Sequence, residues 1–82
     1  MESYNNKRKS NVKAYKIGTD YIIVEFIGGA ETFYKYTYRS CGEHEVELLK
    51  SLAEAGEGLN DELSRNGHPD YEKKGKTLSE VM

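Results

Sequence analysis

Residues 32–53 read TFYKYTYRSCGEHEVELLKSLA, and the spacing of their aromatic and apolar residues changes near position 40. Before that position, Tyr34, Tyr36 and Tyr38 occupy alternate positions, which is the repeat of a β-strand. After it, apolar residues recur at helical spacing, which is typical of a helix that buries one face. The stretch therefore predicts a strand over residues 32–39 followed by an amphipathic helix.

Two further strands are predicted upstream of this stretch. Residues 21–27 are rich in β-branched and aromatic side chains and form the clearest strand of the chain. Residues 12–17 form another strand, which is followed by a turn over residues 18–20. Gly28 and Gly29 supply the positive φ angles that a hairpin turn needs. Because the connections are short, we expect the three strands to pair as an antiparallel meander.

Two helices are predicted in the second half. Ser40 and Glu43 have the spacing of a capping box at the start of the first helix, and Gly56 is suited to ending it. The apolar positions of this helix are Val46, Leu49, Leu52 and Ala53. A second, shorter helix is marked by two leucines and by a glycine and a proline beyond its end: Leu59, Leu63, Gly67 and Pro69.

The predicted fold class is α+β, with a three-stranded antiparallel β-meander followed by two helices packed on one face (β-β-β-α-α). The predicted core consists of Ile22, Val24, Phe26, Val46, Leu49, Leu52, Leu59 and Leu63. Residues 1–10 and 68–82 are largely polar, so they bury too little to offset the entropy of ordering them. We therefore expect one domain over residues 11–67, with a disordered basic tail before it and a largely disordered tail after it.

The pattern leaves open which face of the sheet carries the tyrosines. An even-length loop around Gly28 and Gly29 places Tyr34 and Tyr36 on the face opposite the core, whereas an odd-length loop places them on the core face. A change of register by one residue exchanges the two arrangements. A bulge at residues 30–31 has the same effect.

Composition limits the classes of protein. The chain has 82 residues and a net charge of −2, with basic residues concentrated in 1–17 and acidic residues in 43–62. Its one cysteine, Cys41, excludes a disulfide within the chain. No signal peptide is visible and no apolar run approaches the length of a membrane helix. We therefore expect a cytoplasmic protein without a membrane partner.

The order of these segments resembles the KTSC domain, a small domain found at the C-terminus of some lysyl-tRNA synthetases and as free-standing bacterial proteins. The resemblance covers roughly residues 11–66 and rests on the following residues: Ile22, Val24, Phe26, Tyr34, Lys35, Tyr36, Gly56, Leu59, Asn60 and Leu63. It departs from the family at Arg39-Ser40, where Val-Pro is usual, and at Glu54, where serine is usual. The resemblance implies a β-β-β-α-α domain of unestablished function, for which RNA binding is the usual suggestion.

A tyrosine-bearing sheet face flanked by basic residues would suit single-stranded RNA or a nucleic-acid-associated complex, because bases stack on aromatic rings and cations contact phosphates. The candidate ligand-binding residues are Tyr34, Lys35, Tyr36, Tyr38, Arg39, Lys13 and Lys16. The same tyrosines also suit packing between strands. The alternative function is protein interaction or homodimer formation, through a free strand edge or an apolar patch of Tyr21, Ile23 and Ile27.

Enzymatic chemistry is not expected. Cys41 and His44 lack a third orienting group for nucleophilic catalysis, and one cysteine with two histidines is too few for a structural zinc site. The acidic residues of 43–62 are interpreted as a solvated helix face, and Lys7-Arg8-Lys9 as a solvated tail. We therefore predict a non-enzymatic binding module with no metal and no cofactor.

Overall fold

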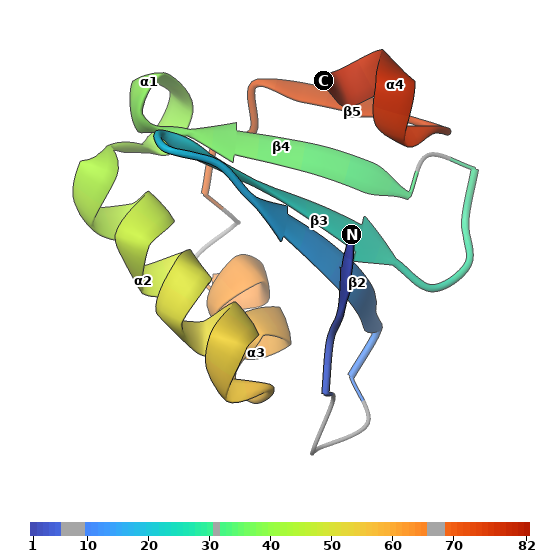
Figure 1. Ribbon diagram of the computed structural model, residues 1–82, viewed down its shortest axis with the longest axis horizontal. Coiled ribbons are helices and arrows are strands. Elements are labelled where there is room, and N and C mark those ends of the chain that lie inside the picture. The colour runs from blue at the N-terminus through green and yellow to red at the C-terminus, as the bar shows by residue number, and fades with distance from the viewer. Residues whose placement is uncertain (6–9, 31, 66–68) are drawn as a thin grey trace.

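The computed structural model describes residues 1–5, 10–30, 32–65 and 69–82. These residues form an α+β fold around an antiparallel sheet of five strands in the order β1-β2-β3-β4-β5 (Figure 1). The strands are β1 (Glu2–Ser3), β2 (Val12–Ile17), β3 (Tyr21–Phe26), β4 (Phe33–Thr37) and β5 (Lys73–Gly75). The helices are α1 (Tyr38–Cys41), α2 (Glu43–Ala55), α3 (Leu59–Ser64) and α4 (Leu78–Val81).

The predicted α+β class is confirmed, but the sheet has five strands and not the predicted three. The central meander β2-β3-β4 has one added strand at each edge, so neither β2 nor β4 is an edge strand. Both added strands lie in segments predicted as disordered tails. The described residues of those segments instead supply β1, β5 and α4 to the fold.

The middle of the sheet forms where the sequence predicts it. Glycines at positive φ, Gly28 at 77° and Gly29 at 92°, connect β3 to β4. Across this hairpin the Phe26 N–H donates to the Thr32 carbonyl over 2.8 Å. The β2-β3 pairing shifts register between Val12 and Ala14, which is the mark of a bulge.

The helix boundaries differ from the prediction at one end. Gly56 ends α2 in the left-handed conformation, at φ 76°, as expected for a glycine after a helix. The expected capping box of Ser40 and Glu43 is absent. The capping box instead joins Thr37 to Ser40 and starts α1, so Tyr38 leaves the strand, and α2 starts after Gly42 without a side-chain cap.

The main core lies between one face of the sheet and helices α2 and α3. Of the predicted core residues, all are buried except Phe26 and Leu52, which are partly buried and pack against the core. Five residues from outside the predicted set join it. They are Tyr4, Val12, Tyr15, Tyr36 and Ala53.

The opposite face of the sheet is covered in part, over β4 and β5. Figure 1 shows α2 and α3 on one side of the sheet and α4 on the other. A Cβ on Gly75 would lie 2.7 Å from the Cβ of Glu80, so α4 sits directly on this part of β5. Ile23 and Val81 are both 0% exposed and lie outside the main core. The expected open apolar patch of Tyr21, Ile23 and Ile27 is therefore wrong at its centre, because Ile23 is buried.

Some residues that the sequence interpretation used lie outside the described part of the chain. They are Lys7, Arg8, Lys9, Glu31, Gly67 and His68.

Candidate functional site

The strand register decides which way the tyrosines point. Ile22 pairs with Tyr36 and Val24 pairs with Tyr34, and residues directly opposite one another share a face of an antiparallel sheet. Tyr34 and Tyr36 therefore lie on the core face, under the helices. This is the odd-length arrangement of the hairpin. The three tyrosines do not form an open platform, because Tyr36 is only 2% exposed and Tyr38 belongs to α1.

The uncovered end of this face is hollowed into a groove of about 590 Å³. Its lining comes from the β2-β3 end of the sheet, from β4, from α3 and from the segment before β5. The lining residues are Asn11, Phe26, Gly28, Gly29, Tyr34, Tyr36, Asn60, Ser64 and Tyr71. We call this feature the aromatic groove.

Aromatic rings in mutual contact form much of the groove. The Tyr34 ring meets Phe26 edge-on with centroids 5.4 Å apart, and it meets Tyr71 edge-on at 5.0 Å. Tyr36 lies roughly parallel to Tyr34 at 6.5 Å. Edge-to-face contacts of this kind hold rings in fixed orientations. Tyr71 is 41% exposed and stands at the open side.

The polar side chains of the groove are neutral and have no bonding partners within the described residues. No side-chain hydrogen bond from Asn11, Asn60, Ser64 or any of the groove tyrosines occurs there. The case of Tyr36 matters most, because burial raises its pKa well above that of an ordinary tyrosine. Polar groups in buried positions are normally hydrogen-bonded. Among the described residues the only buried side-chain polar atom without a partner is Glu45 Oε2, so the Tyr36 hydroxyl reaches the open space of the groove and is accessible to a ligand.

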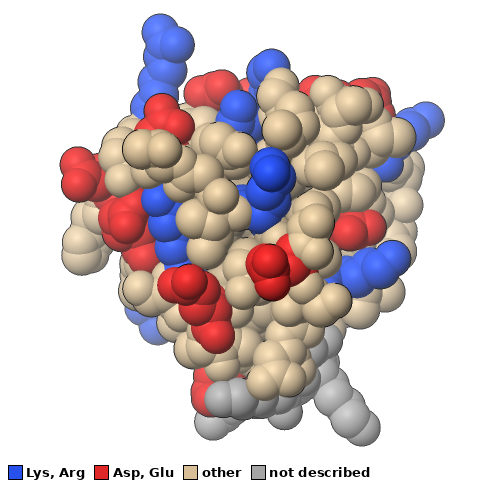
Figure 2. Space-filling model, viewed as in Figure 1, with Lys and Arg blue, Asp and Glu red and all other residues tan. Residues whose placement is uncertain are grey.

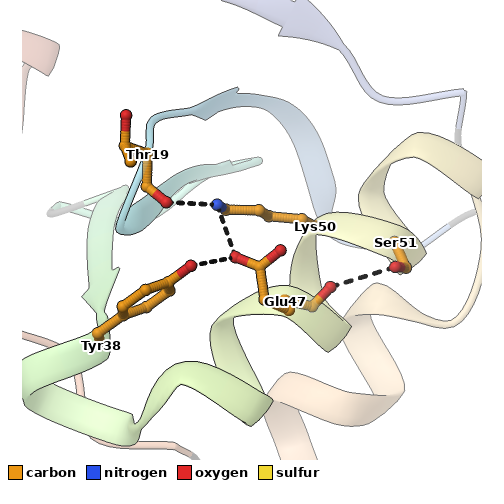
Figure 3. Close-up of polar contacts among 5 residues, drawn as sticks. All are labelled: Thr19, Tyr38, Glu47, Lys50 and Ser51. Atoms are coloured by element: carbon orange, nitrogen blue, oxygen red, sulfur yellow. Dashed lines mark hydrogen bonds and ion pairs between the residues drawn. The ribbon is translucent and has the colours of Figure 1, made fainter.

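Tyr38 has a different role from the one expected. Its hydroxyl donates to Glu47 Oε2 over 2.6 Å, and Lys50 Nζ lies 2.8 Å from the same oxygen (Figure 3). Lys50 also donates to the Thr19 carbonyl over 3.0 Å. This network fastens α2 to the β2-β3 turn. Tyr38 is therefore a structural residue of the far end of the sheet, away from the aromatic groove.

The network makes stability depend on pH. Hydrogen bonds from Lys50 and Tyr38 lower the pKa of Glu47, and the bond to Glu47 raises the pKa of Tyr38 to about 12. Glu47→Gln should therefore lower the melting temperature above the ordinary glutamate pKa of about 4.3, and the difference from wild type should vanish as the pH falls through the lowered pKa. Tyr38→Phe should differ from wild type below pH 10.0 and converge with it as the pH approaches about 12.

Thermal unfolding over a series of pH values measures both effects. Glu54→Gln changes an exposed glutamate of the same helix and is the matched control. A Glu47→Gln variant that differs from wild type equally at acidic and neutral pH would contradict the network.

The predicted basic residues are separated from the tyrosines. Lys16 and Lys35 pair with Ile23 from its two sides, so they lie on the face opposite the groove. Lys13 lies at the bulge of β2, with Nζ 3.7 Å from Glu25 Oε2. Arg39 is exposed in α1. Figure 2 shows acidic side chains gathered over α2, with basic and acidic side chains mixed elsewhere on that side of the molecule.

The residues considered for catalysis are placed as follows. Cys41 ends α1, and its thiol donates to the Thr37 carbonyl over 3.6 Å. Burial raises the pKa of this thiol, whereas reactive cysteines have lowered pKa values. The acidic residues of α2 are not all solvated: Glu45 is half-buried, and burial together with the neighbouring Glu62 of α3 raises its pKa.

Sequence reasoning missed several residues of the groove. Asn11 and Ser64 carry no local signal of a site. Tyr71 is an isolated aromatic residue in a polar segment, and that isolation was the one available signal. Asn60 was noted only as a mark of the family resemblance. The groove brings Asn60 together with Tyr34 and Tyr36, from which it is distant along the sequence.

Within the described ranges, no group of three or more His, Cys, Asp or Glu residues is arranged to hold a metal ion. No helix in those ranges has the length and apolar character needed to cross a membrane. Comparisons of the chain with protein-family models, with curated proteins and with solved structures find no match in any of the three.

Proposed function

We propose that this chain is a non-enzymatic binding module and that the aromatic groove accepts an unpaired base of single-stranded RNA. The observation that carries the proposal is the neutral polar lining, which has no bonding partner within the described residues and surrounds a set of fixed aromatic rings. A lining of this kind favours a neutral, planar group that offers both donors and acceptors.

A nucleobase meets these requirements. Its faces stack on aromatic rings for about 1–3 kcal/mol per base, and its edges pair with side-chain amides. Asn11 and Asn60 each offer a donor and an acceptor, and the Tyr36 hydroxyl offers one more of each. The volume of about 590 Å³ lies within the range of roughly 300–1,000 Å³ that is usual for ligand pockets.

Basic side chains lie outside the groove, and they favour a nucleic-acid strand, which carries phosphates, as the ligand over a free base. Lys74 Nζ lies 5.7 Å from the centre of the Tyr71 ring at the open side. A second depression, of about 490 Å³, shares Phe26, Gly28 and Gly29 with the groove and extends to Lys13. Few cations are available, so we expect binding with a modest dependence on salt.

The resemblance to the KTSC domain adds support of a different kind. The two tyrosines of its Tyr-x-Tyr mark and the asparagine after its helix are Tyr34, Tyr36 and Asn60, and all three line the groove. A shared role for these residues in one site accounts for their joint occurrence. We keep the assignment to this family as part of the proposal.

Tyr36→Phe is the sharpest test, because it removes one hydroxyl and keeps the buried ring. We expect the affinity for oligouridine or oligoadenosine to fall about two- to twelvefold, since one hydrogen bond contributes about 0.5–1.5 kcal/mol. The measurement is titration of the full chain followed by backbone amide NMR. Wild-type shifts should centre on Asn60 and Ser64 of α3.

Tyr38→Phe is the matched control, because it makes the same change outside the groove. It should leave the affinity unchanged. The proposal fails if the oligonucleotides cause no saturable shifts, or if Tyr36→Phe binds them as wild type does.

Protein interaction is the alternative, and it has less support. The expected apolar patch is interrupted by the burial of Ile23, and β1 and β5 pair with the strands whose edges were expected to be free. What remains is a groove whose neutral amides would also suit the backbone of a peptide. Saturable binding of a protein partner at the groove, with none of either oligonucleotide, would favour this alternative.

A further inference from the structure

The face opposite the groove carries three lysines in a single line. The strand registers pair Lys16 with Ile23, Ile23 with Lys35, and Lys35 with Lys73. The line therefore crosses β2, β3, β4 and β5, with one lysine on every strand except β3. Since neighbouring strands lie about 5 Å apart, the Lys16 and Lys35 backbones are separated by about 10 Å. We call these residues the lysine row.

The positive charges of the row are not balanced by contact with carboxylates. Within the described residues, no carboxylate oxygen lies within ion-pair distance of Lys16, Lys35 or Lys73. Lys35 is instead held over the ring of Tyr21, with Nζ 4.8 Å from its centre. The cation is thus fixed by an aromatic face, which leaves its three N–H donors available.

The acidic groups of the same face have other partners. Glu25 lies beside Lys13, and Glu72 accepts a hydrogen bond from the Thr37 hydroxyl over 2.9 Å. Glu80 accepts hydrogen bonds from the backbone N–H groups of Lys76 and Thr77 at the start of α4. These carboxylates moderate the field of the face but do not neutralise the row by direct contact.

Like charges directly opposite one another destabilise a sheet, and Lys35 and Lys73 are such a pair. Protection of an edge strand against aggregation explains a lysine on β5. It does not explain Lys35 on β4 or Lys16 on β2, because both strands have neighbours on each side. An anion placed between the ammonium groups would remove the repulsion and add charge-assisted hydrogen bonds.

We propose that the lysine row is a binding site for a phosphate-bearing anion, separate from the aromatic groove. The paired Lys35 and Lys73 hold one phosphate, and Lys16 extends the site to a second. Two sources share this chemistry, a free polyphosphate and the phosphodiester chain of a nucleic acid. The site does not depend on what the groove binds.

Titration of the full chain with inorganic pyrophosphate at low ionic strength tests the proposal. Backbone amide shifts should be saturable and centre on β4 and β5 around Lys35 and Lys73, with little change at Asn60. Lys35→Gln and Lys73→Gln should each weaken binding about tenfold, because each removes a charge-assisted hydrogen bond. Lys76→Gln removes an exposed lysine outside the row and should bind as wild type does.

The absence of saturable shifts would overturn the proposal, and so would an equal loss in Lys76→Gln, which would indicate general charge attraction. The oligonucleotide titration separates the two sources. If the row contacts a phosphodiester chain, Lys35→Gln weakens oligonucleotide binding and lowers the dependence of log affinity on log salt concentration by about one. If oligonucleotides fail to bind while pyrophosphate does, the source is a free polyphosphate. That last result would contradict the proposed function of the groove but would still agree with the proposal for the lysine row.

Discussion

Replacing Ile23 by aspartate is expected to lower the free energy of unfolding by about 3 kcal/mol or more. Ile23 lies at the centre of β3 and is 0% exposed, although it does not belong to the main core. The Ile23 side chain points to the outer face of the sheet, which is the side on which α4 lies. An aspartate there would be a buried carboxylate without a partner, which is among the most destabilising of single changes.

Ile27→Asp is the matched control, because it makes the same substitution at an isoleucine that is 57% exposed. It should change the free energy of unfolding by no more than about 0.5 kcal/mol. Denaturant unfolding measures both variants. If the Ile23→Asp chain were as stable as Ile27→Asp, the outer face of the sheet would be open, and β5 with α4 would not be part of the folded domain.

Replacing Tyr36 by alanine is the change with the second large effect. Tyr36 is 2% exposed within the main core, and truncation of a buried aromatic ring costs about 3–5 kcal/mol. Tyr36→Phe should cost less than about 0.5 kcal/mol, because the hydroxyl has no partner to lose within the described residues.

Equilibrium unfolding of the two Tyr36 variants provides the comparison. The ring thus serves the fold, while the hydroxyl remains available for a ligand. A Tyr36→Phe variant that loses as much stability as Tyr36→Ala would show that the hydroxyl is bonded within the protein. The strongest support for the groove would then be gone.

The predictable part of the fold is the part encoded by local spacing. The composition of residues 21–27, the alternation in residues 32–39 and the helical repeat after position 40 correctly predicted β3, β4 and α2, although β4 ends at Thr37. Gly56 ends a helix as expected, and Gly28 and Gly29 make the turn as expected. These features depend on one residue and its near neighbours, so they can be predicted without knowledge of the rest of the chain.

The unpredicted elements are short and depend on distant partners. β1, β5 and α4 contain few apolar residues, and their order comes from single side chains such as Tyr4 and Val81, which are buried against the rest of the molecule. Tyr4 also accepts a hydrogen bond from the Leu59 N–H at the start of α3, far along the chain. Tertiary contacts of this kind override local composition.

For the site, the sequence pointed to residues of the right kind but could not place them together. Which face Tyr34 and Tyr36 occupy depends on whether a hairpin loop has an even or odd number of residues, and composition does not determine that. The same parity places Lys35 on the opposite face, where the β2-β3 pairing also places Lys16. Asn11 joins the groove through the pairing of β2 with β3, and Tyr71 joins it through the pairing of β4 with β5.

The placement of Tyr36 beneath the helices is the claim on which the groove, the lysine row and both proposals depend. Proton–proton contacts observed by NMR between the Tyr36 ring and methyl groups test it most directly. We predict contacts with methyl groups of α2 and α3, such as those of Val46, Leu49 and Leu63. Contacts instead with Ile23 and Val81, on the other side of the sheet, would contradict the account.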